Sequence, residues 1–449
     1  MVDSLNSFLF STPEMTRVFS PQEQLRAMTR FEWALLCALE VNGLADAGAS
    51  AILEALLDAE FIDETLLERE ARDAGNIAIP FVRQLTAAVK ARDERASRSV
   101  HLGATSQDVL DTALVLQMRE GLRLIEDAMG RLDAALVKQA RAHRETVLSG
   151  RTWLQEGPPT TLGLKLAGTI AALRRHRDRL HSAAERAVVL EFGGAVGTLA
   201  ALGSKGTSVS VKLAELLDLA EPAMPWHAQR DNLVEVVQVL AGLTGSLGKF
   251  ARDVALLMQT EVSEVSEADG EEHGGSSTMP HKHNPVGCAA VIAAHARMLG
   301  LAATMLGAMV QEHERGLGLW QAEWETVPES FRLTSAALAH SIEIAKGLAV
   351  DGERMQANID AQLGTSMSEA VNAALAPKMG RAAAHEVLRK ATTRAMKEKR
   401  HLGAVLREMP EVTAHLNDEQ IDRLLDPREY LGSAQEFIAR VLGELDAQS

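Results

Sequence analysis

The stretch from 275 to 285 contains the side chains with the clearest chemical potential: Gly-Ser-Ser-Thr-Met-Pro-His-Lys-His-Asn-Pro. It offers hydroxyl groups, an ammonium group at Lys282 and an amide at Asn284, behind a glycine-rich polar stretch typical of a loop. Asn284 followed by Pro285 predicts a helix start, with Asn as the N-cap. Lysine and helix N-termini both attract negative charge, so we expect an active site for an anion here.

Two other segments combine polar groups with predicted helix starts. In His101-Leu-Gly-Ala-Thr-Ser-Gln-Asp108, Thr105 and Ser106 can cap the helix that follows, and its free N–H groups can hold a carboxylate. The alternative is a plain N-cap without a ligand. In Gly150-Arg-Thr-Trp-Leu-Gln155, Arg151 can pair either with a substrate carboxylate or with a structural one.

Further candidates precede or end other predicted helices. Gln229 and Arg230 come just before the third long helix, where they can face the same cleft. Arg315 is expected at the end of the fourth, to bind a carboxylate or to complement the helix dipole. His281 and His283 lack the spacing of a zinc site, and the sequence predicts no metal and no cofactor.

Composition narrows the functional class. The 449 residues carry a formal net charge of −15, which argues against a nucleic-acid surface. Two cysteines give no disulfide framework, and the start lacks a signal peptide, so a cytoplasmic location is expected. The most apolar run, Met298 to Val310, looks too short to cross a bilayer, and no membrane association is expected.

Long proline-free helical patterns dominate the middle of the chain and must position these groups. They cover roughly 107–147, 160–190, 230–265, 286–312 and 329–348. Helices of this length are stable only when packed together, which predicts a bundle. Shorter amphipathic helices precede and follow it, for example over Pro21 to Leu44. We therefore predict an all-α chain with domains at 1–106, 107–358 and 359–449.

Two features of the long segments concern packing. Gly242, Gly245 and Gly248 weaken an isolated helix, so we expect them to permit close approach between helices. The segment Cys288 to Val310 is apolar nearly all round, which predicts burial on most sides. One bundle of a single chain cannot bury it fully, so we expect oligomerisation through this helix.

Taken together, the three polar segments resemble the signature regions of the fumarase/aspartase superfamily. The third region, Gly-Ser-Ser-x-Met-Pro-x-Lys-x-Asn-Pro, is complete at 275–285. The first is matched at 105–108 and the second at 150–155, including Thr152 and Gln155. The resemblance implies a three-domain, all-α subunit and a homotetramer with active sites shared between subunits. Its substrate would be a small polycarboxylate.

Trp153 departs from the superfamily pattern, in which most lyases have a histidine at this position acting as a general acid. Indole has no proton that titrates near neutral pH, so it cannot take that role. The variant resembles the lactonising branch of the superfamily, the cycloisomerases, in which a carboxylate of the substrate adds to a double bond of the same molecule.

The resemblance implies the following roles. Lys282 stabilises the developing negative charge and can deliver the proton, with Ser276 as the rival donor; Trp153 and Arg315 complete the catalytic set. The expected substrate-binding residues are His101, Thr105, Ser106, Gln107, Arg151, Thr152, Gln155, Gln229, Arg230, Ser277 and Asn284. Two alternatives remain: an adenylosuccinate-type lyase, and a non-catalytic structural homologue of the kind found among lens crystallins.

Overall fold

Helices make up almost all of the regular structure, which confirms the predicted all-α class. The computed structural model describes residues 8–267, 279 and 282–444. Five long helices form the middle of the chain: α6 (Ser106–Ala142), α7 (Leu162–Ala187), α9 (Asp231–Leu257), α10 (Val286–Ala308) and α11 (Leu319–Gly347). Four of them begin within two residues of the prediction. The fifth, α11, begins at Leu319 instead of 329, because Pro328 lies inside the helix, whereas a proline in a sequence usually indicates a helix boundary.

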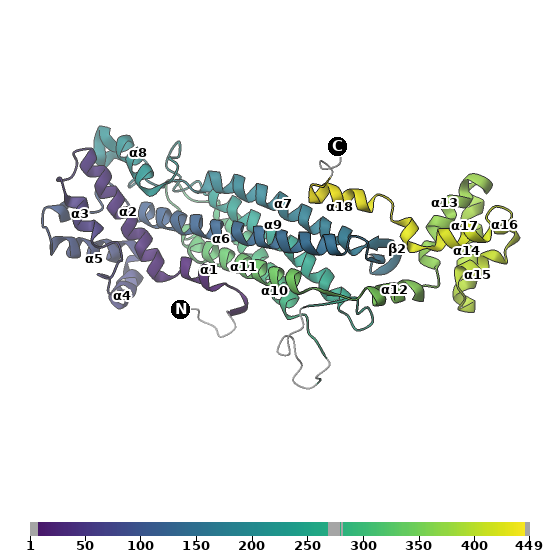
Figure 1. The fold of residues 1–449 in the computed structure, drawn as a ribbon. Coiled ribbons are helices and arrows are strands. Elements are labelled where there is room, and N and C mark those ends of the chain that lie inside the picture. Colours follow the sequence, from purple (N-terminus) through teal and green to yellow (C-terminus); the bar gives the residue numbers. More distant parts are fainter. Residues whose placement is uncertain (1–7, 268–278, 280–281, 445–449) are drawn as a thin grey trace. The chain divides into compact units, whose positions relative to one another are not determined.

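Shorter helices occupy both ends of the chain (Figure 1). The first group is α1 (Pro13–Val18), α2 (Pro21–Val41), α3 (Ala49–Glu54), α4 (Glu64–Ala74) and α5 (Ala78–Lys90), with α8 (Gly206–Leu217) packed on α2. The last group is α12 (Gly352–Ala361), α13 (Ser368–Met379), α14 (Arg381–Glu398), α15 (Leu402–Arg407), α16 (Pro410–Thr413), α17 (Asp418–Leu425) and α18 (Ala434–Leu442). Short 3₁₀ turns lie at Ala96–Ser99, Ala200–Lys205, Thr365–Met367 and Pro427–Tyr430.

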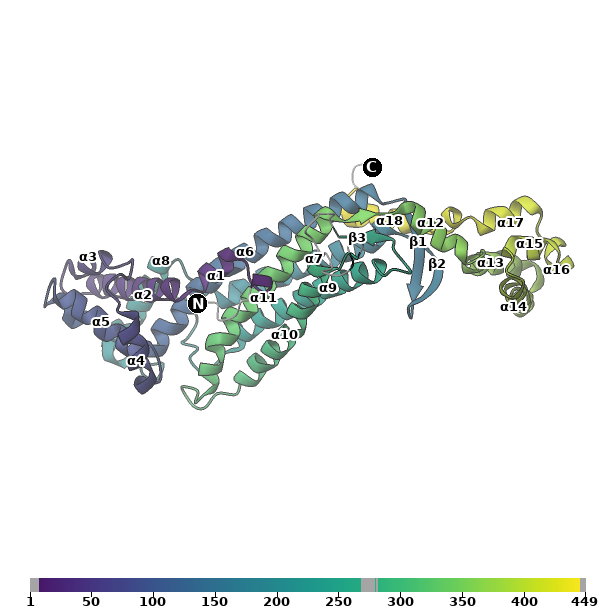
Figure 2. The ribbon, with the colours of Figure 1, turned by 90° about the horizontal axis from the view of Figure 1, so that it is seen from below.

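The chain forms two compact units, each assembled from three stretches of sequence. The first comprises residues 1–129, 176–245 and 293–339, and the second 130–175, 246–292 and 340–449. All five long helices contribute a segment to each unit, and within a unit these segments lie side by side (Figures 1 and 2). The predicted boundaries at 106 and 358 therefore stay a prediction.

A β-hairpin in the second unit was not predicted. Strand β1 (Val147–Thr152) pairs antiparallel with β2 (Gln155–Thr161), and the register shifts between Ser149 and Arg151. A second short pair joins β3 (Val265–Ser266) to β4 (Ala349–Val350). The hairpin lacks a run of alternating apolar residues because most of it is not buried, so the usual strand signal is absent.

The glycines of α9 make room for histidines of the neighbouring helices. A Cβ at Gly242 would lie 3.3 Å from the His176 ring of α7, and one at Gly245 would lie 3.3 Å from the His295 ring of α10. The His295 Nδ1 atom also lies 3.2 Å from the Thr244 hydroxyl. The expectation of close packing at these two positions is confirmed, with imidazole rings as the neighbouring groups.

Two helices are long and apolar enough to cross a membrane by length and composition alone, α9 and α10. The core helix of a soluble protein passes the same test, so this finding does not contradict the expectation for the shorter run Met298 to Val310. Of the most apolar window, 56% is buried in α9 but only 39% in α10. Leu299, Leu306 and Val310 are exposed along and just beyond α10. A large apolar surface of this helix is therefore uncovered in the single chain.

Gly163 tests the packing of α7 on α6 in the second unit. A Cβ there would lie 2.6 Å from the Arg144 Cα atom and 2.8 Å from the Ala140 carbonyl oxygen, and backbone atoms cannot move aside cheaply. Gly163→Ala should therefore lower stability by about 1–3 kcal/mol, measured as a fall in Tm.

Gly168→Ala is the matched control in the same helix. Gly168 is exposed, and a Cβ added there would meet no other atom within 4 Å. Alanine should raise helix stability here by up to about 1 kcal/mol. If both variants changed Tm in the same direction, the close contact at Gly163 would not control the packing.

Candidate active site

Trp153 forms the tip of the hairpin together with Leu154. Both residues adopt left-handed backbone conformations, with φ of 54° and 61°. Two consecutive positive φ angles in a two-residue turn match the geometry that joins twisted antiparallel strands most tightly. Trp153 is 98% exposed and Leu154 is 74% exposed, so the described part of the chain leaves both side chains largely uncovered. Thr152 and Gln155, which flank the turn, are exposed as well.

Arg151 lies at the base of the same turn and is bound by a structural carboxylate. Its two terminal nitrogens donate to the two oxygens of Glu264 at 2.9 and 2.6 Å. Glu264 is fully buried and also accepts from Asn358 at 2.8 Å. Burial alone would lower the pKa of Arg151, but the hydrogen bonds and charge of Glu264 raise it. Arg151 therefore fixes the hairpin, and we remove it from the proposed substrate ligands.

The N-terminus of α10 is also occupied by a side chain of the protein. The backbone N–H groups of Gly287 and Cys288 donate to the Glu267 carboxylate at 3.1 and 2.8 Å. The sequence predicted that this helix end would bind the anionic substrate, and the internal carboxylate corrects that expectation. The helix begins at Val286, one residue after the predicted start.

Lys282 is exposed just ahead of α10 and has no ion pair among the residues that the structure describes. Its backbone N–H donates to the Met279 carbonyl at 3.0 Å. Asn284 is half-buried beside it. Ser276 and Ser277, the two predicted loop serines, lie outside the described residues.

Thr105 and Arg315 come together in the first unit. The Arg315 guanidinium donates to the Thr105 hydroxyl at 2.8 Å and to the Ala195 carbonyl at 3.2 Å. Arg315 lies in the loop after α10, because the helix ends at Ala308 and not at its predicted end near 312. The threonine hydroxyl thus accepts from arginine, and a cation lies at the start of α6. Half-buried Ser106 is the first residue of that helix.

His101 is held beside this segment by Glu32 of α2. The His101 Nδ1 atom lies 2.5 Å from one Glu32 oxygen, and its backbone N–H donates to the other at 3.1 Å. Burial alone would lower the pKa of His101, but the charge and hydrogen bond of Glu32 raise it. Only Nε2 of this ring is left to contact a ligand.

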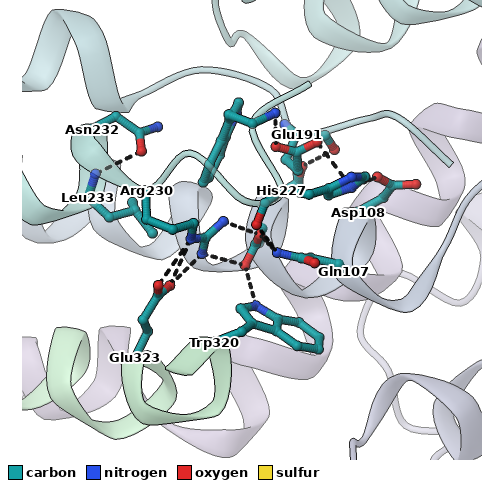
Figure 3. A network of polar contacts seen from close by, with 12 residues as sticks. Gln107, Asp108, Glu191, His227, Arg230, Asn232, Leu233, Trp320 and Glu323 are labelled. Carbon is teal, nitrogen blue, oxygen red and sulfur yellow. Dashed lines mark hydrogen bonds and ion pairs between the residues drawn. The ribbon is translucent and has the colours of Figure 1, made fainter. Parts of the chain in front are cut away.

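Asp108 anchors three loops at the start of α6 (Figure 3). Its two oxygens accept the N–H groups of Thr105, Gly193 and Gly194 at 2.8 to 3.0 Å, and His227 Nε2 at 2.7 Å. A Glu191 carboxylate oxygen lies 3.2 Å from the same Nε2 atom of His227. Burial raises the pKa of Glu191 well above its usual value, and the charges of Asp111 and Asp108 add to this.

By composition, Asp108, Glu191 and His227 could form a metal site. The geometry does not fit one. The Asp108 oxygens already accept four donors, and the distance from His227 Nε2 to Asp108 is that of a direct hydrogen bond. The group is therefore a structural hydrogen-bonded cluster.

Arg230 is completely buried between two carboxylates from neighbouring helices. It donates to Asp111 of α6 at 2.6 and 3.1 Å and to Glu323 of α11 at 2.5 to 3.1 Å. Trp320 donates to Asp111 at 3.0 Å, as does Gln107. Figure 3 shows the guanidinium enclosed by these groups. Burial alone would lower the pKa of Arg230, and both carboxylates raise it.

This network contains two of the predicted substrate ligands and corrects one of them. Arg230 is fully engaged by Asp111 and Glu323, and Gln107 is fully buried, with its amide nitrogen bound to Asp111 and to the His227 carbonyl. Arg230 cannot contact a ligand without breaking these buried ion pairs. The Gln107 carbonyl oxygen has no hydrogen-bond partner among the described residues, so Gln107 stays a proposed ligand. Gln229, next to Arg230, is exposed and stays a proposed ligand.

Sequence reasoning also missed partners of these groups. Glu264 and Glu267 follow α9, and Asp111 and Glu323 lie inside long helices, so nothing in their spacing marks them as pairs. The one available signal was a charged residue on the apolar face of a predicted helix, since buried charges require partners.

Known proteins with similar sequences and structures identify the family. Residues 34–300 match the family model described as "Lyase", and residues 364–441 match "Adenylosuccinate lyase C-terminus". The 3-carboxy-cis,cis-muconate cycloisomerase of Pseudomonas aeruginosa is 50% identical, over 97% of this chain and 95% of its own.

Two further relatives show how far the similarity extends. The crystal structure of 3-carboxy-cis,cis-muconate lactonizing enzyme from Pseudomonas putida superimposes with a TM-score of 0.93 at 49% identity, covering 98% of this chain and 99% of that one. Nitrosuccinate lyase of Streptomyces davaonensis is 39% identical over 94% of this chain and 90% of its own. The superfamily motifs, the helical architecture and these matches agree: the chain belongs to the lyase family of the fumarase/aspartase superfamily.

Proposed function

We propose that this chain is a 3-carboxy-cis,cis-muconate cycloisomerase, which converts its substrate to a carboxymuconolactone. Trp153 is the observation that carries the proposal, since an indole replaces the imidazole that serves as general acid in most superfamily lyases. The relatives with this activity match nearly the whole chain at up to 50% identity. We also propose that the enzyme is cytoplasmic and needs no cofactor.

The reaction suits a site without that imidazole. One carboxylate oxygen of the substrate forms a C–O bond to a carbon of its own double bond. The π electrons move to the adjacent carbon as an enolate-like intermediate, which then takes one proton. No leaving group departs and no water is activated. The site therefore has to stabilise negative charge and deliver a single proton.

Lys282 is the cation proposed to stabilise the intermediate, and it or Ser276 delivers the proton. Lys282 is exposed and unpaired among the described residues, so it is available to a ligand. Arg315 beside Thr105 offers a second cation for a substrate carboxylate. The proposed binding set is completed by His101, Ser106, Gln107, Thr152, Gln155, Gln229, Ser277 and Asn284.

The proposed active site is shared between subunits of a homotetramer. An indole that is 98% exposed at the end of a hairpin is poorly placed to surround a substrate within its own chain. The exposed apolar residues of α10 provide a surface for subunit contact, since uncovered apolar patches mark interaction sites. Packing of neighbouring subunits would cover both the Trp153 indole and the exposed apolar residues of α10.

The activity itself can be tested with two substrates. Purified protein should remove the diene absorbance of 3-carboxy-cis,cis-muconate and yield a lactone identifiable by mass and NMR. It should leave adenylosuccinate intact, although the C-terminal match to adenylosuccinate lyase makes that substrate the proper comparison. Release of fumarate from adenylosuccinate, with no lactone formed, would assign the chain to the alternative function. No turnover of either substrate would favour a structural homologue.

Replacing Lys282 tests the proposed charge stabilisation. Lys282→Met should lower kcat by about 10²–10³-fold, the usual effect of removing one preorganised group that stabilises transition-state charge. Lys397→Met removes an exposed lysine of α14 and serves as the control. Unchanged kcat in Lys282→Met would exclude this residue from the mechanism.

Substitutions at Trp153 distinguish a role as an apolar wall of the site from a role as a general acid. Trp153→Phe keeps an aromatic surface and should retain most activity. Trp153→Ala should lose about 10²-fold, because substrate positioning is lost. Trp153→His should also lower lactone formation, since it brings a polar ring to an apolar wall. Higher activity in Trp153→His than in wild type would mean that the reaction needs a titratable group here.

Mixing inactive variants tests the shared site. Trp153→Ala and Lys282→Met subunits, unfolded together and refolded, should regain activity well above the residual activity of either variant alone. Recovery is expected because some mixed tetramers contain sites with both residues intact. Refolding each variant separately is the control. If the mixture stays inactive while mass spectrometry detects mixed tetramers, both residues belong to one subunit's site.

A further inference from the structure

A hollow of about 630 Å³ lies between α1, α2 and α6 in the first unit, apart from the residues proposed for catalysis. Its size falls in the range of roughly 300–1,000 Å³ typical of small-molecule sites. Its apolar lining consists of the buried residues Val18 and Leu116 and the half-buried residues Trp33 and Leu57. This lining suits a ligand with an apolar body.

The charged part of the lining is mostly positive. It contains Arg17, Arg26, Arg30 and Arg119 against the two carboxylates Glu23 and Glu120. Such a cluster is notable in a chain with a net charge of −15. An anion would be attracted to this hollow by local charge, against the field of the whole chain.

Both glutamates are paired with arginines. Glu23 accepts from Arg26 at 2.6 Å. Glu120 accepts two hydrogen bonds from Arg123, which lies outside the hollow, at 2.7 and 2.9 Å. The Arg123 hydrogen bond is the main cause of the lowered pKa of Glu120, while Arg119 and Arg17 contribute through their charges.

The remaining arginines have weaker contacts with carboxylates. The guanidinium groups of Arg17 and Arg30 have no hydrogen bond or ion pair within the part of the chain that the structure describes. Arg119 donates to the Leu217 and Asp218 carbonyls at 3.0 and 2.7 Å, and the exposed Asp218 carboxylate is 3.5 Å away. Burial lowers the pKa of Arg119 and the charge of Arg30 lowers it further, while the charges of Asp218 and Glu120 act in the opposite direction.

We propose that this hollow binds an organic polyanion, with two or more carboxylates on an unsaturated or aromatic body. Arg17 and Arg30 would bind the carboxylates, since guanidinium groups match them in geometry. The Trp33 indole and the Leu57 side chain would contact the body. An apolar wall gives no benefit to a small inorganic anion, which favours the organic ligand.

Calorimetry on the full-length protein tests this proposal, with benzene-1,3,5-tricarboxylate as the probe. Arg17→Gln/Arg30→Gln should weaken one class of binding sites by at least about tenfold, equivalent to ~1.4 kcal/mol. The matched control is Arg69→Gln/Arg72→Gln, which removes two exposed arginines of α4 in the same unit and should bind as wild type does. Turnover of the proposed substrate at saturation should not change in either variant, which separates this site from the catalytic one.

Several outcomes would overturn the proposal. Equal probe binding in wild type and both double variants would remove Arg17 and Arg30 from any site. Equal loss in both variants would indicate a general charge effect. Inorganic phosphate that binds as tightly as the tricarboxylate would contradict the role of the apolar wall. If light scattering showed that Arg17→Gln/Arg30→Gln alters subunit number while probe binding persists, the hollow would be a subunit contact.

Discussion

The burial of Arg230 between Asp111 and Glu323 is the constraint on which the first unit depends. A guanidinium without exposed surface is stable only if carboxylates compensate its charge, and α6 and α11 each supply one. Removing one partner of such a buried pair typically costs about 3–5 kcal/mol. This interaction fixes α6, α9 and α11 relative to one another within the unit.

That constraint determines what the neighbouring residues can do. Because Asp111 is fixed one turn into α6, Asp108 can bind three loops and a histidine at the start of the same helix. Those bonds place Thr105, and Thr105 in turn binds Arg315. The polar residues of the first signature region thus form two layers. The inner layer, with Gln107 and Asp108, is buried, and the outer layer, with Thr105, Ser106 and Arg315, is half-buried.

The sequence predicts the positions of the helices better than it predicts the ion pairs between distant residues. Helical periodicity and the cap at Asn284 located four long helices, because local patterns determine where a helix begins. The predicted start of α11 is wrong because of Pro328. Tertiary packing tolerates this proline inside the helix, whereas local sequence rules treat a proline as a helix boundary. Sequence alone does not show whether Arg151 and Arg230 bind a substrate, because an arginine near a motif looks the same whatever supplies its carboxylate. In the structure the carboxylates come from Glu264 and Glu323. Those partners lie 113 and 93 positions away, beyond the range of any spacing rule.

The turn that displays Trp153 has an energetic consequence. Left-handed backbone costs a residue with a side chain about 1–2 kcal/mol, and Trp153 and Leu154 both adopt it. A turn shaped by folding alone would place Asn and Gly here. An indole and an isobutyl group at the tip, both surrounded by water, therefore raise the free energy of the isolated subunit. Burial of these two side chains against another molecule would offset that cost through the hydrophobic effect.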